Sequence, residues 1–356
     1  SGNYIHGSFR IPSMQTEVIS SVSPANLQDT VGDFATNIAE VELAVESASQ
    51  AFKKWKRLKL EDRINFLMKF QEIVAARQEE FAHLIAREVG KPLWEARTEV
   101  KGVIGKVTIS LNEGLQQVKD ISIEDILPNT EGVMSYRPLG VLAVLGPFNF
   151  PAHLPNGHIV PALLSGNSVV FKPSEKTPAV GQFLVECFDQ AGLPPGVINL
   201  VQGGVGVSKA LAEHDDINGV LFTGSYNAGK AIKQATIEQP WKLLALEMGG
   251  KNSAIVWEDA DLDTALYETL TGAFMTSGQR CSATGKILVH YTLLDEFVNR
   301  FVGLSESLVV GHPMEKVFMG PVIDSHAKNS ILAAVKNASE SGFENPVKMT
   351  EVKLEY

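Results

Sequence analysis

The chain has 356 residues, of which 44% are hydrophobic and 20% charged, a composition typical of a globular protein with two or more packed units. Its formal net charge of −10 argues against nucleic acid or an anionic membrane surface as a partner, because both require a basic face. Two cysteines cannot make a disulfide framework and no apolar stretch suits a signal peptide or a membrane span, so we expect a soluble protein of the cytoplasm.

The apolar pattern along the chain predicts an α/β fold. Apolar residues at helical spacing indicate one long amphipathic helix over 61–88. Short apolar runs of strand length then recur at 141–145, 169–171, 197–201, 220–222, 243–246 and 254–257. Helical stretches separate these runs, and this alternation predicts a parallel sheet with helices on both faces. The polar segment 120–138, extended over 133–136, interrupts the alternation and is expected to leave the main domain.

Polar residues directly follow several of the predicted strands. In a parallel sheet, ligands bind beyond these carboxyl ends of the strands. Asn149 follows the first strand, so its amide is placed to donate to a developing oxyanion. The alternative is an Asx turn that satisfies its own backbone. Lys172 and Glu175 follow the next strand, and a lysine donor with a glutamate acceptor suits ribose hydroxyls. A solvated surface turn is the alternative there.

A glycine turn follows the strand at 220–222. Gly224 comes directly before a predicted helix, and the backbone N–H groups and dipole of a helix start favour a phosphate. The turn is not a G-x-G-x-x-G fingerprint, so by itself it indicates an anion site and is incomplete evidence for a dinucleotide.

Two further residues have the chemistry of a base and a nucleophile. Glu247 follows an apolar strand, so we expect its carboxylate to be partly desolvated and therefore a better base near neutral pH. An ion pair with a lysine is the alternative. Cys281 follows Arg280 in a polar loop, which favours a thiolate. Cys187 instead lies in an apolar helical pattern and is expected to be a small buried hydrophobe.

Together these segments resemble a known family. GPFNFP, FKPSE, FTGS, EMGGKN and GQRCS occur in the order and approximate spacing of the aldehyde dehydrogenase superfamily, and the likeness covers nearly the whole chain. Within it the chain looks most like the succinylglutamate semialdehyde dehydrogenases, which are bacterial enzymes of arginine catabolism. The stretches that carry this narrower likeness are 90–100, 149–167, 191–204 and 245–250.

The resemblance implies a division of the chain into three parts. A Rossmann-like NAD-binding domain covers 1–119 and 140–246, an oligomerisation excursion covers 120–139, and the first part of an α/β catalytic domain covers 247–356. We therefore expect a homo-oligomer for the complete protein.

The resemblance also implies the role of each site residue. Cys281 attacks the aldehyde, the Asn149 side chain and the Cys281 backbone N–H hold the oxyanion, hydride passes to NAD, and Glu247 activates the water that hydrolyses the thioester. Lys172 and Glu175 hold the adenosine ribose. The remaining cofactor contacts are Phe222, Gly224, Ser225 and Gly229.

The candidate substrate contacts are Arg280, His153 and Phe150. A guanidinium suits the carboxylates of an acidic semialdehyde such as N-succinylglutamate semialdehyde. The alternative for Arg280 is that it points away from the substrate and pairs with a surface acid. No metal site is expected.

Two departures from the family pattern bear on these expectations. Lys286 stands where family members usually have an arginine, five residues after the nucleophile. The chain also ends at Tyr356, before a Glu-x-Phe-Gly-Pro motif and the C-terminal strand that completes the oligomer, so a truncated chain or a shortened protein is expected.

Three other functions remain open. The first is another aldehyde dehydrogenase of amino-acid catabolism, for example one acting on pyrroline-5-carboxylate or glutamate semialdehyde. The second is an acylating or phosphate-reducing relative, against which Glu247 argues, because such relatives generally lack that glutamate. The third is a non-catalytic fragment that binds a nucleotide or a partner chain.

Overall fold

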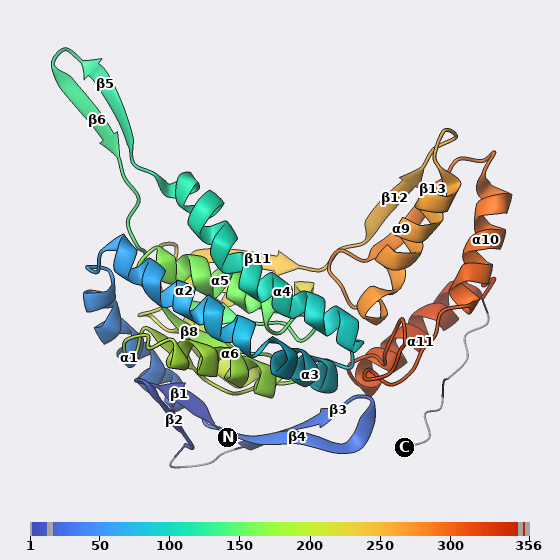
Figure 1. Ribbon diagram of the computed structural model, residues 1–356, viewed down its shortest axis with the longest axis horizontal. Helices are drawn as coiled ribbons and strands as arrows, with labels where there is room; N and C mark the ends of the chain where they lie inside the picture. The colour runs from blue at the N-terminus through green and yellow to red at the C-terminus, as the bar shows by residue number, and fades with distance from the viewer. Residues whose placement is uncertain (1, 13–16, 348–351, 353–356) are drawn as a thin grey trace. The chain divides into compact units, whose positions relative to one another are not determined.

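The computed structural model describes residues 2–12, 17–347 and 352 (Figure 1). The chain divides into two compact units. The first unit comprises 1–21, 32–81 and 97–247, and the second comprises 22–31, 82–96 and 248–356. The three-part domain assignment made from the sequence stays a prediction.

The first unit is built on a seven-stranded sheet with the order β11-β10-β7-β8-β9-β1-β2. Its strands are β1 (Asn3–Ile5), β2 (Ser8–Arg10), β7 (Val141–Leu145), β8 (Ser168–Lys172), β9 (Ile198–Leu200), β10 (Gly219–Gly224) and β11 (Leu243–Met248). The four strands β10, β7, β8 and β9 pair in parallel, whereas β1 joins β9 in antiparallel orientation. The predicted parallel sheet is confirmed for the runs at 141–145, 169–171, 197–201 and 220–222, whereas the run at 254–257 lies in a separate pair of strands.

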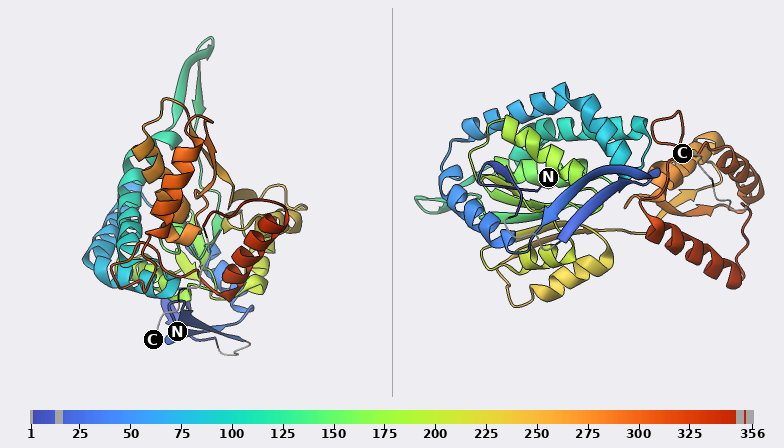
Figure 2. Two further views of the ribbon diagram at one scale, coloured as in Figure 1. Left: turned by 90° about the vertical axis from the view of Figure 1, so that its right-hand side faces the viewer. Right: turned by 90° about the horizontal axis from the view of Figure 1, so that it is seen from below.

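Helices cover both faces of this sheet, as predicted (Figure 2). They are α1 (Glu40–Trp55), α2 (Leu60–Ala76), α5 (His153–Leu164), α6 (Pro178–Gln190), α7 (Val205–Glu213) and α8 (Tyr226–Ala235). Helix α2 packs against α5 and α6, and α7 packs against α1 and α8. The core between α2 and α6 includes Phe70 and Phe188, whose rings stack with centroids 3.8 Å apart. Cys187 is buried beside Phe188, as predicted for a structural cysteine.

The strand order places a topological switch point between β7 and β10. The chain runs from β7 to β8 and β9 on one side, then returns to β10 on the other side of β7. In such sheets ligands bind beyond the carboxyl ends of the two strands at the switch point. Asn149 follows β7 and Ser225 follows β10, so both lie at this edge of the sheet.

The single helix predicted over 61–88 is wrong, because two helices cover this stretch. Helix α2 ends at Ala76 and α3 (Gln78–Val89) begins two residues later. Between them Arg77 leaves helical geometry, with φ −105° and ψ 17°. Its guanidinium bonds Glu80 at 2.8 and 2.7 Å and lies 4.0 Å from the centroid of the Phe183 ring. The apolar spacing continues across the break, so periodicity could not show it.

The segment predicted to leave the main domain follows α4 (Leu93–Ile109) and two short helical turns, Ser110–Gly114 and Leu115–Val118. It forms an antiparallel hairpin of β5 (Ile121–Leu127) and β6 (Thr130–Met134), which extends away from the helices of the first unit (Figure 1). Asn129 makes its turn with φ 57°, a conformation that asparagine tolerates. The exposed apolar residues of the hairpin are Ile121, Ile123, Ile126, Leu127, Val133 and Met134.

The second unit contains a parallel pair of strands, β12 (Asn252–Val256) and β13 (Thr284–Val289). Its helices are α9 (Leu262–Phe274), the short turn η3 (Met275–Gly278), α10 (Leu294–Glu306) and α11 (Ser325–Glu340). Val256, Leu266 and Phe297 form its small core. The Asp261 side chain caps α9 by accepting from the Thr264 N–H at 2.8 Å.

Strands β3 (Glu17–Ser23) and β4 (Asn26–Thr36) form a separate two-stranded pair. Across the part of the chain that the structure describes, no helix has both the length and the apolarity to cross a bilayer.

Candidate functional site

Asn149 lies in the loop between β7 and α5 and is half-buried. Its Oδ1 accepts a hydrogen bond from the backbone N–H of Phe150 at 3.1 Å. This bond to the next residue is not that of an Asx turn, which needs the N–H two residues on, and Pro151 has none. The bond fixes the orientation of the carboxamide, so the NH₂ group is the end that can donate to an oxyanion.

Glu99 holds the segment that follows Asn149. This buried residue of α4 accepts from the backbone N–H groups of Ala152 and His153 at 3.0 and 3.1 Å, at the start of α5. Free N–H groups at a helix start need such an acceptor, and a carboxylate there also complements the helix dipole. Sequence reasoning missed this role, because a glutamate 53 residues before Ala152 leaves no local capping signal.

Phe150 and His153, the two candidate substrate contacts in this segment, are half-buried. The His153 ring packs closely against α4 at Gly102, where an added Cβ would lie 2.8 Å from Nδ1. Gly102 is therefore the residue that makes room for this ring. Phe150 lies directly before Pro151 in the loop.

Lys172 and Glu175 form an ion pair at the end of β8, with Nζ 3.3 Å from Oε2. The Lys172 side chain is 5% exposed and that of Glu175 is 43% exposed. Burial lowers the pKa of Lys172, although the charge and hydrogen bond of Glu175 oppose the shift. Burial alone would raise the pKa of Glu175, but Lys172 and a backbone N–H outweigh it and lower the pKa. The pair presents both a cationic donor and an anionic acceptor.

The glycine turn after β10 has the geometry of an anion site. An added Cβ at Gly224 would lie 2.5 Å from the ring of Phe222, so a larger residue there would require this ring to move. Ser225 caps α8, since its Oγ accepts from the Ala228 N–H at 3.2 Å. Gly229 is buried in the first turn of this helix. Ser225 is exposed, so the first turn of α8 is open to a ligand.

Glu247 lies near the end of β11, the strand that begins beside the start of β10. Glu247 is exposed, so the prediction that its carboxylate is partly desolvated is wrong. The strand lies at the edge of the sheet, and its residues are exposed or half-buried although five of them are apolar. Apolar composition alone did not distinguish this edge strand from a central one.

A histidine that sequence reasoning missed lies near Glu247. His158 of α5 has Nε2 3.5 Å from the Thr223 hydroxyl of β10. Burial lowers its pKa; the charge of Glu247 opposes this shift and that of Lys106 adds to it. A single histidine in an apolar helix carries no signal that separates it from an ordinary core residue.

Cys281 is exposed, in the loop between η3 and β13. Its carbonyl oxygen accepts from the side-chain amide of Asn252 at 2.7 Å, and the same amide donates to the Ala283 carbonyl at 3.2 Å. Asn252 is the last residue of the EMGGKN segment, so it connects that motif to the one that carries the cysteine. Lys286 lies on β13 beside Ser253 of β12 and is exposed.

Arg280 pairs with an acid. Its Nη2 lies 2.9 Å from Oε2 of Glu95, and its Nε donates to the Thr276 hydroxyl at 2.8 Å. The partner is a buried carboxylate, 1% exposed, rather than the surface acid considered from the sequence.

The candidate residues divide between the two units. Asn149, the Lys172–Glu175 pair, the Gly224 turn and Glu247 belong to the first unit, and Cys281 and Arg280 belong to the second. Among the residues that the structure describes, no three or more His, Cys, Asp or Glu side chains gather as a metal site.

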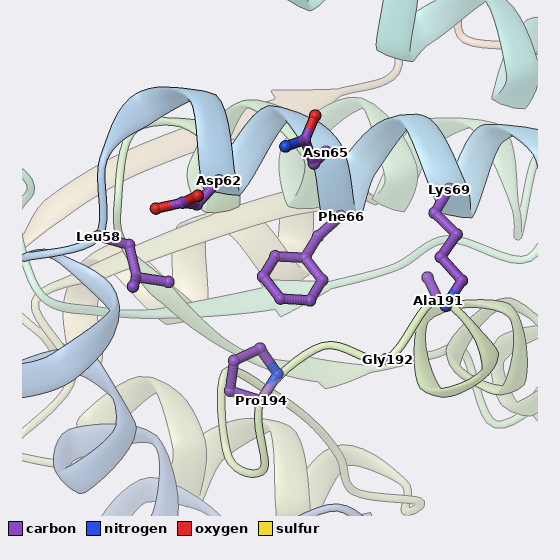
Figure 3. A pocket seen from close by; sticks show the side chains of 8 residues that line it. All are labelled: Leu58, Asp62, Asn65, Phe66, Lys69, Ala191, Gly192 and Pro194. Carbon is purple, nitrogen blue, oxygen red and sulfur yellow. The ribbon is translucent and has the colours of Figure 1, made fainter.

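A hollow of about 530 Å³ lies elsewhere on the first unit (Figure 3). Asp62, Asn65, Phe66 and Lys69 of α2 form one side, and the Phe66 ring points toward Pro194 on the other. None of the candidate site residues lines it.

Comparisons with known proteins agree with the motifs. A family model described as the aldehyde dehydrogenase family matches residues 11–353. The chain is 47% identical over 296 residues to an N-succinylglutamate 5-semialdehyde dehydrogenase from Sphingopyxis alaskensis, a match that covers 83% of this chain. It spans 61% of the length of that relative.

Solved structures show the same fold. An aldehyde dehydrogenase from Bartonella henselae superposes with a TM-score of 0.93 at 27% identity, covering 99% of this chain and 74% of the other. A 3,6-anhydro-L-galactose dehydrogenase in complex with NAP superposes with a TM-score of 0.92 at 29% identity, covering 99% and 75% of the two chains. The α/β fold and the family resemblance expected from the sequence are confirmed.

Proposed function

Because this chain belongs to the aldehyde dehydrogenase family, we propose that the protein oxidises an aldehyde to a carboxylate with NAD, through a thioester at Cys281. The observation that carries this proposal is the placement of Cys281. Cys281 is exposed, and its carbonyl oxygen accepts a hydrogen bond from Asn252. The preceding residue, Arg280, forms an ion pair with Glu95. Cys187 is buried, and burial raises the pKa of its thiol to about 12, so it cannot take this role.

The following residues would perform the proposed steps. The Cys281 thiolate adds to the aldehyde carbon, and the carbonyl oxygen becomes an oxyanion. The NH₂ group of Asn149 and the backbone N–H of Cys281 would donate to that oxygen. A bound nicotinamide dinucleotide supplies the acceptor for the hydride that leaves the carbon. Glu247 then takes a proton from water, whose oxygen attacks the thioester and releases the carboxylate and the thiolate.

The cofactor site that we propose is the carboxyl edge of the parallel sheet. Lys172 and Glu175 supply a donor and an acceptor for the adenosine ribose, and the exposed first turn of α8 supplies backbone N–H groups for the pyrophosphate. The other proposed contacts are Phe222 and Gly224 at the end of β10, the cap residue Ser225, and Gly229 in the first turn of α8. A carboxylate at the ribose favours NAD over NADP, because it would repel a 2′-phosphate.

We propose an acidic semialdehyde, N-succinylglutamate semialdehyde, as the substrate. The support is the 47% identical relative that carries this name. His153, Phe150 and Arg280 remain the candidate substrate contacts. The ion pair of Arg280 with Glu95 gives this arginine a structural role besides substrate binding. The two roles predict different kinetic effects of the substitution Arg280→Leu.

Two further properties belong to the proposal. The exposed apolar hairpin of β5 and β6 is an edge that another chain can cover, so a homo-oligomer is proposed, with light scattering of the full-length protein as its check. A cytoplasmic location is proposed because two free cysteines suit a reducing compartment.

The test of the function is an oxidation assay with the full-length protein. We expect NADH to form with N-succinylglutamate semialdehyde and the product to be the free dicarboxylate, identified by mass spectrometry. Product formation that requires coenzyme A or inorganic phosphate would instead identify an acylating or phosphate-dependent relative. Tight nucleotide binding with no NADH from any aldehyde tested would favour a non-catalytic protein.

A further inference from the structure

Glu95 connects the first turn of α4 to the loop that carries Cys281. Its Oε1 accepts from the backbone N–H of Thr276 at 2.9 Å. Its Oε2 accepts from the Thr276 hydroxyl at 2.6 Å and from Nη2 of Arg280 at 2.9 Å. The Thr276 hydroxyl itself accepts from Nε of Arg280 at 2.8 Å. These bonds join Glu95, Thr276 and Arg280 into one closed network.

The network is buried, which makes its bonds difficult to lose. The Glu95 side chain is 1% exposed, and that of Arg280 is 22% exposed. A carboxylate removed from water must be compensated by donors, and here a guanidinium, a hydroxyl and a backbone N–H provide them. Removing the negative charge would leave these three donors facing a poorer acceptor.

The backbone beside the network has an unfavourable conformation. Thr276 and Ser277 have φ values of 55° and 56°, and Gly278 follows with 71°. Two of these residues are not glycine, and a β-branched residue in the left-handed region is an outlier that surrounding contacts must maintain. Glu95 holds the Thr276 N–H, and the Ser277 hydroxyl donates to the Gly320 carbonyl at 2.7 Å.

The loop is fixed on both sides of the nucleophile. Before Cys281, the side chain of its neighbour Arg280 is held by Glu95 and Thr276. After it, Asn252 holds the carbonyls of Cys281 and Ala283. The position of the cysteine thus depends on a residue of α4 that lies 186 positions earlier in the sequence.

We propose that Glu95 is a positioning residue, which keeps the loop over 276–280 in the conformation that presents Cys281 for attack. This inference rests on the proposed function for the identity of the nucleophile. Glu95 acts through Thr276 and Arg280 and does not touch the substrate. Arg280 is accordingly a part of the loop support.

The test compares Glu95→Gln with a matched control, Glu40→Gln, in the full-length protein. Glu40 is also a buried glutamate bound to an arginine, with Oε2 3.2 Å from Nε of Arg10, but it lies on α1 in the first unit. Both substitutions remove one buried charge without changing shape. A general loss of stability would therefore appear in both variants.

The first readout does not depend on activity. Trypsin cleaves after arginine, and we expect the Arg280–Cys281 bond to resist cleavage while Thr276 and Glu95 hold the Arg280 side chain. We expect Glu95→Gln to raise the rate of cleavage at this bond by about fivefold or more. In this variant, local opening of the loop over 276–280 would no longer break charge-assisted hydrogen bonds to a carboxylate. Glu40→Gln should cleave there at the wild-type rate.

The second readout is kinetic. We expect Glu95→Gln to lower kcat by about tenfold to a hundredfold, because a misplacement of about 1 Å has an effect of that order. The KM for NAD should stay within about twofold of the wild type, since the proposed cofactor contacts lie on other elements. Thr276→Ser, which keeps the hydroxyl, should retain activity, and Thr276→Val, which has a similar shape without it, should not.

The outcomes separate the inference from the proposed function. Unchanged cleavage, an unchanged kcat, or equal effects of Glu95→Gln and Glu40→Gln would each overturn the role of Glu95. Faster cleavage in Glu95→Gln, beside a wild type that oxidises no aldehyde, would show that the network holds the loop but that the proposed function is wrong.

Discussion

The side-chain amide of Asn252 donates to the carbonyl oxygen of Cys281 at 2.7 Å. The two residues lie 29 positions apart, and the pairing of β12 with β13 brings their segments together, with Asn252 beside Thr284. The motif that carries the proposed base therefore continues into a strand that supports the proposed nucleophile. A substitution at Asn252 should disturb Cys281 without any contact to substrate.

Asn149→Ala tests the oxyanion donor. The substitution removes the NH₂ group proposed to donate to the oxyanion, and we expect kcat to fall by about 10²-fold or more. Asn65→Ala, which removes an exposed asparagine on α2, is the control and should leave kcat unchanged. A fall of less than about threefold for Asn149→Ala would remove this residue from the proposed mechanism.

Glu175→Gln tests the preference for NAD. Like charges about 4 Å apart near a surface repel by roughly 1–4 kcal/mol, so loss of the carboxylate should narrow the difference in kcat/KM between NAD and NADP by about tenfold or more. Glu213→Gln, on α7, is the control. Equal efficiency of the wild type with both cofactors would contradict the role given to Glu175.

Lys172 predicts a pH dependence of cofactor binding. Burial lowers its pKa, so the ammonium loses its proton at a lower pH than an exposed lysine, whose pKa is about 10.4. The charged donor is lost as the pH rises through this lowered folded-state pKa. We therefore expect the KM for NAD to rise with pH already below the pH at which an exposed lysine titrates, and to be higher but independent of pH in Lys172→Met. A wild-type KM that does not change with pH below the titration of an exposed lysine would refute the assignment.

Arg280→Leu distinguishes the two uses of this arginine. If Arg280 binds a substrate carboxylate, the KM for an acidic semialdehyde should rise by roughly 10- to 150-fold, since a charge-assisted contact contributes about 1.5–3 kcal/mol, and a neutral aldehyde should be unaffected. If it supports the loop with Glu95, as we infer, kcat should fall for both substrates alike. Arg97→Leu, which removes an exposed pair with Glu79, is the control.

Much of the first unit could be predicted from sequence. The run 141–145 coincides with β7, and the runs at 169–171 and 220–222 lie inside β8 and β10, because central parallel strands are buried on both faces and therefore continuously apolar. The polar residues after these strands lie at one edge of the sheet for the same topological reason.

Other features depend on contacts between distant residues, which a single sequence does not record. Arg77 leaves helical geometry between α2 and α3 although the apolar spacing continues across it, and its guanidinium lies over the ring of the distant Phe183. The exposure of Glu247 follows from the place of β11 at the sheet edge, which no local pattern shows. Glu95 is an ordinary helical glutamate by sequence, and only the fold brings it to Thr276. The site motifs could be recognised, whereas the residues that support them could not.

The most direct test of the proposed mechanism is rapid-mixing kinetics of Glu247→Gln. We expect a burst of NADH close to one equivalent of active sites, followed by a very slow steady rate, because Cys281 still forms the thioester while the base for hydrolysis is absent. Cys281→Ala should give no burst at all. Steady turnover of Glu247→Gln at the wild-type rate, or a burst that survives Cys281→Ala, would contradict the thioester account.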